Sequence, residues 1–268
     1  MDANSAVAER QAAPRSGSVL FTAYVLVLLV ITVPPLWVAL LVLPAGRWPD
    51  RVLKGCIRLV VRASGCRLSV TGVEHLGTGG SAMLVANHSS YIDSVVLMAA
   101  LPIDCRFVAN HRLMSVPLIS TAIRQTRYLV VDRTAMRARR ACLLAIVDTL
   151  QHGTSVLVFP EGTISRGPDL LPFRAGAFRA AVETGRPVVP ISLRGTRDIL
   201  PYRSWLLRQG TIVVTIHAPI AVSRGARPEI VRARDCARHE IVSGLRRRED
   251  LGRLGAPGAG KHARVPRS

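Results

Sequence analysis

His88 and Asp93 form an HX4D motif, with four residues between them in the stretch NHSSYID. An imidazole becomes an effective general base when a carboxylate holds one ring nitrogen and the other nitrogen faces a hydroxyl group. A turn from a strand into a helix would give the two side chains this geometry. A histidine after a buried strand is also often only a hydrogen-bonded structural residue, so the pair alone leaves both interpretations open.

A second unusual stretch, FPEGT at residues 159–163, follows the first at a distance typical of a single domain. It adds a carboxylate, Glu161, and a glycine, Gly162, whose missing side chain lets the backbone approach a ligand closely. Read by itself, Pro-Glu-Gly-Thr is simply a turn after a strand. The stretch therefore gains weight only in combination with the HX4D motif.

Short apolar runs around the motif indicate the elements that position it. Residues 81–86 are typical of a buried strand and residues 92–101 of an apolar helix. His88 therefore falls at the carboxyl end of a strand, where open α/β sheets place their ligands.

Strand and helix patterns alternate from residue 67 onward, as in α/β folds. The predicted fold is α/β, a mixed, mostly parallel sheet flanked by helices, with an N-terminal membrane-embedded helical segment. Strands are expected at 68–73, 83–86, 105–109, 128–131, 155–159, 188–193 and 212–216. Helices are expected at 92–101, 116–124, 135–151, 176–183 and 229–247.

Composition narrows the class of protein. A chain of 268 residues with 49% hydrophobic content can hold one large domain with an appendage. The net charge of +19 fits an anionic partner, and 4% aromatic content without a zinc-finger, RRM-like or helix-turn-helix signature favours anionic membrane lipids over nucleic acid. The five cysteines are scattered without a C-x-x-C spacing, so we expect reduced thiols and no metal. No nucleotide-binding or serine-hydrolase motif occurs.

An uncharged run over residues 19–43 is long enough to cross a bilayer as one helix. Pro34 and Pro35 interrupt it, which leaves two geometries open: a kinked spanning helix, or a re-entrant hairpin that enters one leaflet and returns. Basic residues flank the run, more of them after it, so the catalytic domain is expected on the cytoplasmic side of the inner or equivalent membrane. Residues 47–63 suggest an amphipathic helix that lies either on anionic headgroups or packed on the domain.

The expected organisation has four parts along the chain. Residues 1–17 form a disordered leader, 18–64 a membrane anchor with an amphipathic helix, 65–250 the catalytic domain, and 251–268 a disordered basic tail.

Four ordered stretches resemble the blocks of the glycerolipid acyltransferases that include the 1-acyl-glycerol-3-phosphate acyltransferases (PlsC-like proteins). They are NHSSYID, YLVVDR, FPEGT and VVPISL, at residues 87–93, 128–133, 159–163 and 188–193. The first and third are specific, and the other two are individually weak. The resemblance covers roughly residues 65–220.

This resemblance implies a role for each matching residue. His88 is the base and Asp93 fixes its tautomer. Arg133 binds the acceptor phosphate, for which the planar guanidinium is well suited. Glu161, with its neighbours Gly162 and Thr163, holds the acceptor. No protein nucleophile is required, because an acyl thioester is already activated and the acceptor hydroxyl attacks it.

The third block departs from the common pattern, because Ile164 stands where many members have arginine. Arg166 or Arg174 could replace that cation, and we favour Arg174, which precedes the next predicted helix. The departure also resembles the branch that includes lyso-ornithine-lipid acyltransferases, so the acceptor stays open.

The leading expectation is a membrane-associated O-acyltransferase of phospholipid biosynthesis that moves a fatty acyl group from acyl-CoA or acyl-carrier protein to lysophosphatidate, giving phosphatidate. No cofactor or metal is expected beyond the donor substrate. Two alternatives remain: acylation of lyso-ornithine lipid or another lysolipid, and a non-enzymatic basic protein that binds membrane surfaces or nucleic acid. Ordering of His88, Asp93 and Glu161 around one cavity would argue against the last.

Overall fold

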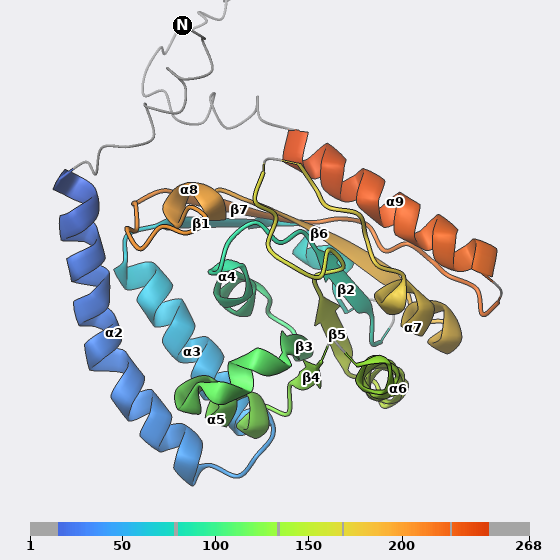
Figure 1. Cartoon of the computed structure of the whole chain (residues 1–268), viewed down its shortest axis with the longest axis horizontal. Coiled ribbons are helices and arrows are strands. Elements are labelled where there is room, and N and C mark those ends of the chain that lie inside the picture. Colours follow the sequence, from blue (N-terminus) through green and yellow to red (C-terminus); the bar gives the residue numbers. More distant parts are fainter. Residues whose placement is uncertain (1–15, 78–79, 133–134, 168, 226, 247–268) are drawn as a thin grey trace, which may run out of the picture.

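The computed structural model in Figure 1 describes most of the catalytic domain and the N-terminal apolar segment. The described residues are 16–77, 80–132, 135–167, 169–225 and 227–246. Outside them lie nearly all of the predicted leader and the whole of the predicted basic tail.

A seven-stranded sheet forms the centre of the domain, in the order β1-β7-β6-β2-β5-β3-β4. Its strands are β1 (Arg67–Thr71), β2 (Met83–Ala86), β3 (Cys105–Asn110), β4 (Leu129–Val131), β5 (Ser155–Val158), β6 (Val188–Arg194) and β7 (Thr211–Ile216). All neighbouring pairs are parallel except β6 and β7. The mixed, mostly parallel sheet predicted from the sequence is therefore confirmed.

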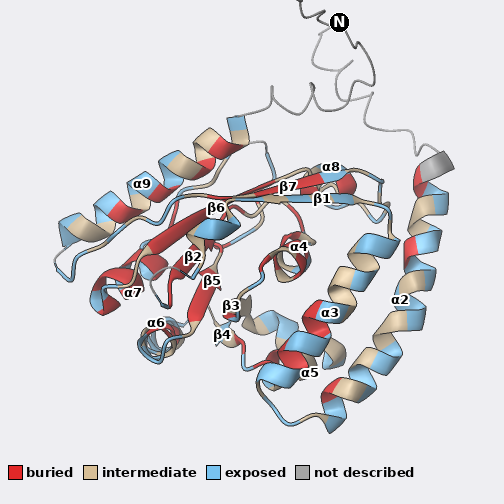
Figure 2. Cartoon of the chain, turned by 180° about the vertical axis from the view of Figure 1, so that it is seen from behind, coloured by how far each residue is buried: buried red, intermediate tan, exposed pale blue. Residues whose placement is uncertain are grey.

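The central strands are buried on both faces, which is why they read as continuous apolar runs. In β2, Leu84 and Ala86 belong to one hydrophobic cluster, whereas Met83 and Val85 belong to a second one across the sheet. Figure 2 shows the buried strands between two layers of helices whose outer faces are exposed. The carboxyl ends of β6, β2 and β5 consequently meet at one edge of a rigid, dry sheet.

Helices cover both faces of the sheet. They are α2 (Ser16–Val42), α3 (Arg47–Ala63), α4 (Asp93–Ala100), α5 (Pro117–Gln125), α6 (Met136–Gln151), α7 (Gly176–Thr184), α8 (Thr196–Ile199) and α9 (Arg227–Arg246). Two 3-10 turns, η1 (Val73–His75) and η2 (His111–Ser115), and the short α8 have no counterpart in the prediction. In Figure 1, α6, α7 and α9 lie on one side and α2 to α5 on the other.

The N-terminal apolar segment is one helix rather than two. Helix α2 continues through Pro34 and Pro35, so the break expected at these prolines and the re-entrant hairpin built on it are both wrong. A proline removes one helical hydrogen bond, but contacts with neighbouring helices can offset that loss. The helix is long and apolar enough to cross a membrane, with a mean hydropathy of 2.8 from Ser18 to Val42.

Helix α2 lies along the flank of the domain over its whole length (Figure 1). Near its start, the Tyr24 hydroxyl donates to the carbonyl of Ala63 at the end of α3. Near its other end, the Trp37 indole donates to Thr121 Oγ1 of α5 over 3.3 Å. The helix therefore runs antiparallel to α3 and shares one long contact face with the domain.

Helix α3 is packed between α2 and the domain. The Arg58 guanidinium donates to the carbonyls of Ala99 and Leu101, where α4 ends. Lys54 is buried with Asp50, and the two side chains form a 2.7 Å ion pair. Of the two placements predicted for residues 47–63, the structure has the helix packed on the domain.

Candidate active site

The first motif lies on the turn between β2 and α4, and β6 holds it in place. The Asn87 side chain donates to the carbonyl of Leu193 and accepts from its amide at 2.7 Å. The Ser90 hydroxyl donates to the carbonyl of Leu200. The strand order places β2 beside β6, so the Asn87 contacts fix the turn on a strand 106 residues further along the chain. Ser90 attaches the same turn to the segment after α8.

His88 and Asp93 have the arrangement predicted for a base and its orienting carboxylate. His88 Nδ1 lies 2.9 Å from Asp93 Oδ2. The same oxygen accepts the main-chain N–H groups of Ser89 at 2.6 Å and Ser90 at 2.8 Å. Because a carboxylate only accepts hydrogen bonds, it places the imidazole proton on Nδ1 and leaves Nε2 as the acceptor.

Burial makes this pair rigid. The Asp93 side chain is fully buried at the first residue of α4, whereas 17% of the His88 side chain is exposed. A carboxylate at a helix start is stabilised by the free amides there. The imidazole is therefore held from within the protein, with one edge left open to a cavity.

Glu161 connects the third predicted block to the first. It follows β5, the other neighbour of β2, and its Oε1 accepts the His88 amide at 2.7 Å. Its Oε2 accepts the Leu171 amide at 2.9 Å. Burial raises the pKa of Glu161, while the two amides and the nearby His88 act in the opposite direction. By this geometry Glu161 positions the backbone of His88, in addition to whatever contact it makes with a substrate.

Phe159 lies between two cavities. Its ring stacks on the His88 imidazole, with centroids 4.1 Å apart and an angle of 16° between the planes. The His88 cavity has a volume of about 400 Å³. Three leucines line it, but most of its lining residues are polar or charged, among them Asn87, His88, Glu161, Asp169, Arg194, Arg197 and Asp198. The apolar cavity has a volume of about 370 Å³; its lining includes Val131, Leu143, Ile146, Phe159, Ala177, Gly162, Arg139 and Arg174.

Arg174 and Gly162, both predicted to bind substrate, lie together, and they line the apolar cavity and not the one containing His88. Gly162 has φ +77, and a Cβ added there would come within 2.6 Å of Arg174 Nε. The main-chain amide of Arg174 also donates to the carbonyl of Pro160. Glycine at this position therefore serves two needs, a left-handed backbone and space for the guanidinium group.

Of the remaining predicted residues, two line neither cavity and one lies outside the described residues. Thr163 is exposed at the end of the block, and it lines neither cavity. Arg133 lies outside the described residues, so its predicted phosphate contact stays a prediction. Arg166, the second choice for the missing cation, stacks over the Tyr202 ring at 5.8 Å.

Sequence reasoning missed Arg197, which joins three loops of the site. It donates to the carbonyl of Ser89 in the first motif and to those of Ser165 and Gly167 in the loop after the third. Thr196, beside it, is fully buried within hydrogen-bonding distance of the Ser89 hydroxyl. The available signal was its place shortly after the end of the predicted strand 188–193, at the same sheet edge as His88.

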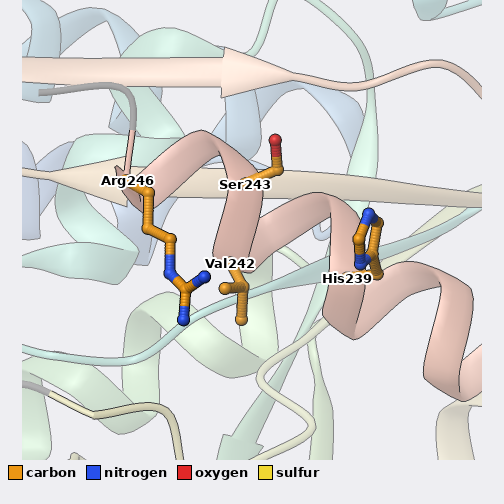
Figure 3. A pocket seen from close by; sticks show the side chains of 4 residues that line it. All are labelled: His239, Val242, Ser243 and Arg246. Atoms are coloured by element: carbon orange, nitrogen blue, oxygen red, sulfur yellow. The ribbon is translucent and has the colours of Figure 1, made fainter. Parts of the chain in front are cut away.

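A third hollow, of about 380 Å³, lies on α9 and contains none of the predicted residues. Figure 3 shows the four side chains that line it, His239, Val242, Ser243 and Arg246, projecting from this one helix. Within the described ranges there is no group of three or more His, Cys, Asp or Glu side chains that could hold a metal ion.

Comparisons with known proteins agree with this geometry. The profile of the acyltransferase family matches residues 67–194, the part of the chain that carries both motifs. A chloroplastic 1-acyl-sn-glycerol-3-phosphate acyltransferase of Brassica napus is 34% identical over 160 residues, which cover 59% of this chain and 46% of that protein. The chain thus spans less than half of this plant relative.

Two bacterial proteins are matched over more of their length. A 1-acyl-sn-glycerol-3-phosphate acyltransferase of Borreliella burgdorferi is 23% identical over 72% of this chain and 78% of its own. The crystal structure of the 1-acyl-sn-glycerophosphate (LPA) acyltransferase PlsC of Thermotoga maritima superposes with a TM-score of 0.68. It covers 91% of this chain and 98% of that one at 22% identity, which establishes a common fold.

Proposed function

With residues 67–194 forming a PlsC-like domain of the acyltransferase family, we propose that the chain is a membrane-associated O-acyltransferase that acylates the free hydroxyl of lysophosphatidate. The observation that carries the proposal is the His88–Asp93 pair, held at 2.9 Å beside a cavity and braced by Glu161. The choice of lysophosphatidate as the acceptor substrate rests on the names of the related proteins. A non-enzymatic basic protein would not need His88 and Glu161 at one cavity, with a buried Asp93 behind the imidazole.

The chain's own residues account for the proposed reaction. His88 Nε2 takes the proton of the acceptor hydroxyl as that oxygen attacks the thioester carbonyl, and Asp93 stabilises the imidazolium that forms. The tetrahedral intermediate then expels the thiolate, which receives the proton from His88. The acceptor oxygen thus ends as an ester and the donor leaves as a free thiol.

The two cavities support a division of the substrates. The His88 cavity contains Arg194 and Arg197 and suits the polar part of the acceptor. The apolar cavity suits an acyl chain. Its two arginines, Arg139 and Arg174, could bind a phosphate group of a substrate at the edge of that cavity. Acyl-CoA and acyl-carrier protein both present a thioester on a pantetheine arm, and both remain in the proposal as donors.

We propose further that α2 lies in the plane of the membrane surface. A helix of 27 residues is roughly 40 Å long, at about 1.5 Å per residue. If it crossed the bilayer upright, it would draw α3 with it, because the two helices are packed along each other. Each arginine or lysine at mid-membrane costs about 3 kcal/mol on insertion scales. Five lie on α3: Arg47, Arg51, Lys54, Arg58 and Arg62.

Anionic lipids are the proposed membrane partner. Trp48, at the start of α3, is 53% exposed, and the guanidinium groups of Arg47 and Arg51 lie over its ring at 5.6 and 5.4 Å. Tryptophan flanked by arginine is typical of the lipid interface. Attachment to the cytoplasmic face of an inner or equivalent membrane follows from the basic flanks of α2.

A second candidate acceptor has its own supporting observation. The lining of the His88 cavity includes Asp169 and Asp198 as well as Arg194 and Arg197, so both signs of charge are present. A zwitterionic headgroup with an ammonium and a carboxylate, as in lyso-ornithine lipid, would find partners for both. Replacement of the usual arginine by Ile164 points the same way.

The decisive test is product analysis with a panel of lysolipids. Purified full-length protein is incubated in mixed vesicles with acyl-CoA or acyl-carrier protein, and the lipids are identified by mass spectrometry. We expect phosphatidate from lysophosphatidate with the wild type and none with His88→Ala. Product from lyso-ornithine lipid alone would establish the second candidate, and the absence of any acylated lipid would refute both.

A further inference from the structure

An exposed aromatic loop lies beside the predicted site and is used by neither substrate cavity. This loop, residues 200–208, follows α8 and carries Trp205, which is 92% exposed. The amide of Arg208 donates to the carbonyl of Ile199 and closes the loop at its base. An indole so fully in water loses hydrophobic stabilisation that any apolar contact would recover.

The aromatic loop has a defined conformation that its own hydrogen bonds hold. Its Ser204 amide donates to the carbonyl of Pro201, and the Ser204 hydroxyl accepts the amide of Leu206. Arg203 adopts φ 63, a left-handed conformation that costs energy for a residue with a side chain. The chain thus accepts a strained turn two residues before a tryptophan that is almost fully exposed.

The surroundings of the loop identify its partner. The Leu207 amide donates to Thr22 Oγ1 of α2 over 2.8 Å. Close to Thr22 on the same helix, Val19 and Leu20 are 49% and 73% exposed. The aromatic loop is therefore attached to a helix that already has the composition of a membrane segment.

Tyrosine and arginine complete the surface on the side facing the site. The rings of Tyr91 and Tyr202 stack with centroids 6.3 Å apart, and Arg166 lies over Tyr202. Tyr91 belongs to the turn that carries His88, and Arg166 to the loop that follows Gly162. A mixture of Trp, Tyr and Arg is typical of the boundary between hydrocarbon and headgroups.

We propose that the aromatic loop is a second membrane contact, in addition to α2, and that Trp205 inserts at the headgroup boundary of the bilayer, close to the turn that carries His88. The role in acceptor delivery rests on the proposed function, whereas the membrane contact itself does not. A lipid that leaves the bilayer beside Tyr91 and Tyr202 has a short path to the HX4D turn.

The membrane contact is tested by fluorescence. The variant Trp37→Phe/Trp48→Phe leaves Trp205 as the only tryptophan of the chain's three. We expect its emission to shift to shorter wavelength on vesicles of phosphatidylglycerol and phosphatidylcholine, and to be quenched when the phosphatidylcholine carries brominated acyl chains. As a second measurement, Trp205→Phe in the otherwise native chain should lower the quenchable share of the emission.

Several outcomes would overturn the proposal. One is unchanged, iodide-accessible Trp205 emission while co-sedimentation shows the protein bound to the vesicles. Another is protection of Trp205 by acyl-carrier protein without lipid, which would assign the loop to that partner. Protection that appears only as protein concentration rises would assign it to a second copy of the chain.

Kinetics test the role in delivery. Trp205→Ala should raise KM for a long-chain acceptor presented in vesicles by about tenfold and leave kcat within about twofold, with no change for a monomeric short-chain acceptor. Leu144→Ala is the matched control, because Leu144 is 57% exposed on α6 at the far side of the sheet. An equal loss for both acceptors, or the same loss in the control, would refute the delivery role. If the chain acylates none of these acceptors, the proposed function fails and the fluorescence result still stands.

Discussion

The two cavities on either side of the His88–Phe159 stack differ in what holds them together. Hydrogen bonds to main-chain groups shape the His88 cavity: Asn87, Glu161 and Arg197 each bind the backbone of another segment. Side-chain packing from α6 and α7 shapes the apolar cavity, for instance through Ile146 and Ala177. Hydrogen bonds fix atoms in direction as well as distance, whereas packing fixes volume. The difference therefore suits the His88 cavity to proton transfer and the apolar cavity to selecting acyl chains by length.

The largest effect should come from the pair that defines the His88 cavity. We expect His88→Ala to lower kcat by at least several hundredfold, since general-base catalysis contributes about 10² to 10⁴. Asp93→Asn should cost a similar factor, because an amide can hold the wrong tautomer of the imidazole. The double variant should be no slower than His88→Ala alone, because both changes disable one unit.

A surface pair supplies the control. His152 and Asp148 lie 3.3 Å apart with side chains 76% and 71% exposed. His152→Ala should leave kcat within about twofold. Losses that multiply in the double variant, or equal losses at both pairs, would show that the buried pair is not a catalytic unit.

Glu161→Gln tests whether backbone hydrogen bonds define the same cavity. The amide group can accept only one of the two N–H donors and turns its own N–H₂ toward the other. An unsatisfied buried donor costs about 1–3 kcal/mol, and the displaced His88 should lower kcat by about 10- to 100-fold. Thermal melting and initial rates measure the two effects. A lower melting temperature with unchanged kcat would show that Glu161 stabilises the fold but does not position His88 for catalysis.

The pH dependence of the free energy of unfolding independently tests the raised pKa of Glu161. Because burial raises its pKa above the ordinary 4.5, the folded protein keeps this proton over a range in which the unfolded chain has lost it. The free energy of unfolding should therefore fall as pH rises from 4.5 through the folded pKa. Denaturant titrations of wild type and Glu161→Gln across that window should show this loss only in the wild type. Parallel curves would contradict the assignment.

The apolar cavity predicts a change in chain-length preference rather than a loss of chemistry. Ala177→Leu places extra bulk in its wall, and we expect kcat/KM for long-chain donors to fall by about tenfold while short-chain donors are unaffected. Ala141→Leu on the exposed side of α6 is the matched control. An equal loss for all chain lengths would mean that the two cavities do not divide the substrates.

Local patterns predicted the strands well because strands buried on both faces appear in the sequence as continuous apolar runs. Strand β2 has the expected bounds, and β5 ends at Val158, one residue before its expected end. The HX4D pair also followed from local spacing, since both residues lie on one turn. Pairings between distant segments leave no such trace, so neither the antiparallel β7 nor the contact of Arg197 with the first motif could be predicted.

Two predictions depended on information that only the tertiary structure holds. The prolines of α2 predict a break in isolation, but α3 and α5 support the helix along its length. Arg174 was predicted as a substrate-binding cation, yet which cavity it lines is set by the direction in which the loop after β5 turns. That direction depends on the left-handed backbone at Gly162, which spacing does not reveal.

Gly162 gives the smallest effect and the finest test of the boundary between the cavities. Gly153 has a similar φ of +83 with nothing near its would-be Cβ, whereas a Cβ at Gly162 would meet Arg174. Gly153→Ala should therefore cost only the backbone strain, about 1 kcal/mol, and Gly162→Ala about 1 kcal/mol more. Denaturant unfolding measures both.

Adding Arg174→Ala separates strain from clash at Gly162. Removing the guanidinium should recover the extra cost in Gly162→Ala but nothing in Gly153→Ala, which makes the coupling between residues 162 and 174 a direct measure of their contact. Suppose that both glycine variants lose the same free energy of unfolding and that Arg174→Ala restores none of it. The Arg174 side chain would then not contact Gly162 in solution. The guanidinium would then be free to reach toward His88, and the separation of the two cavities would fail at this point.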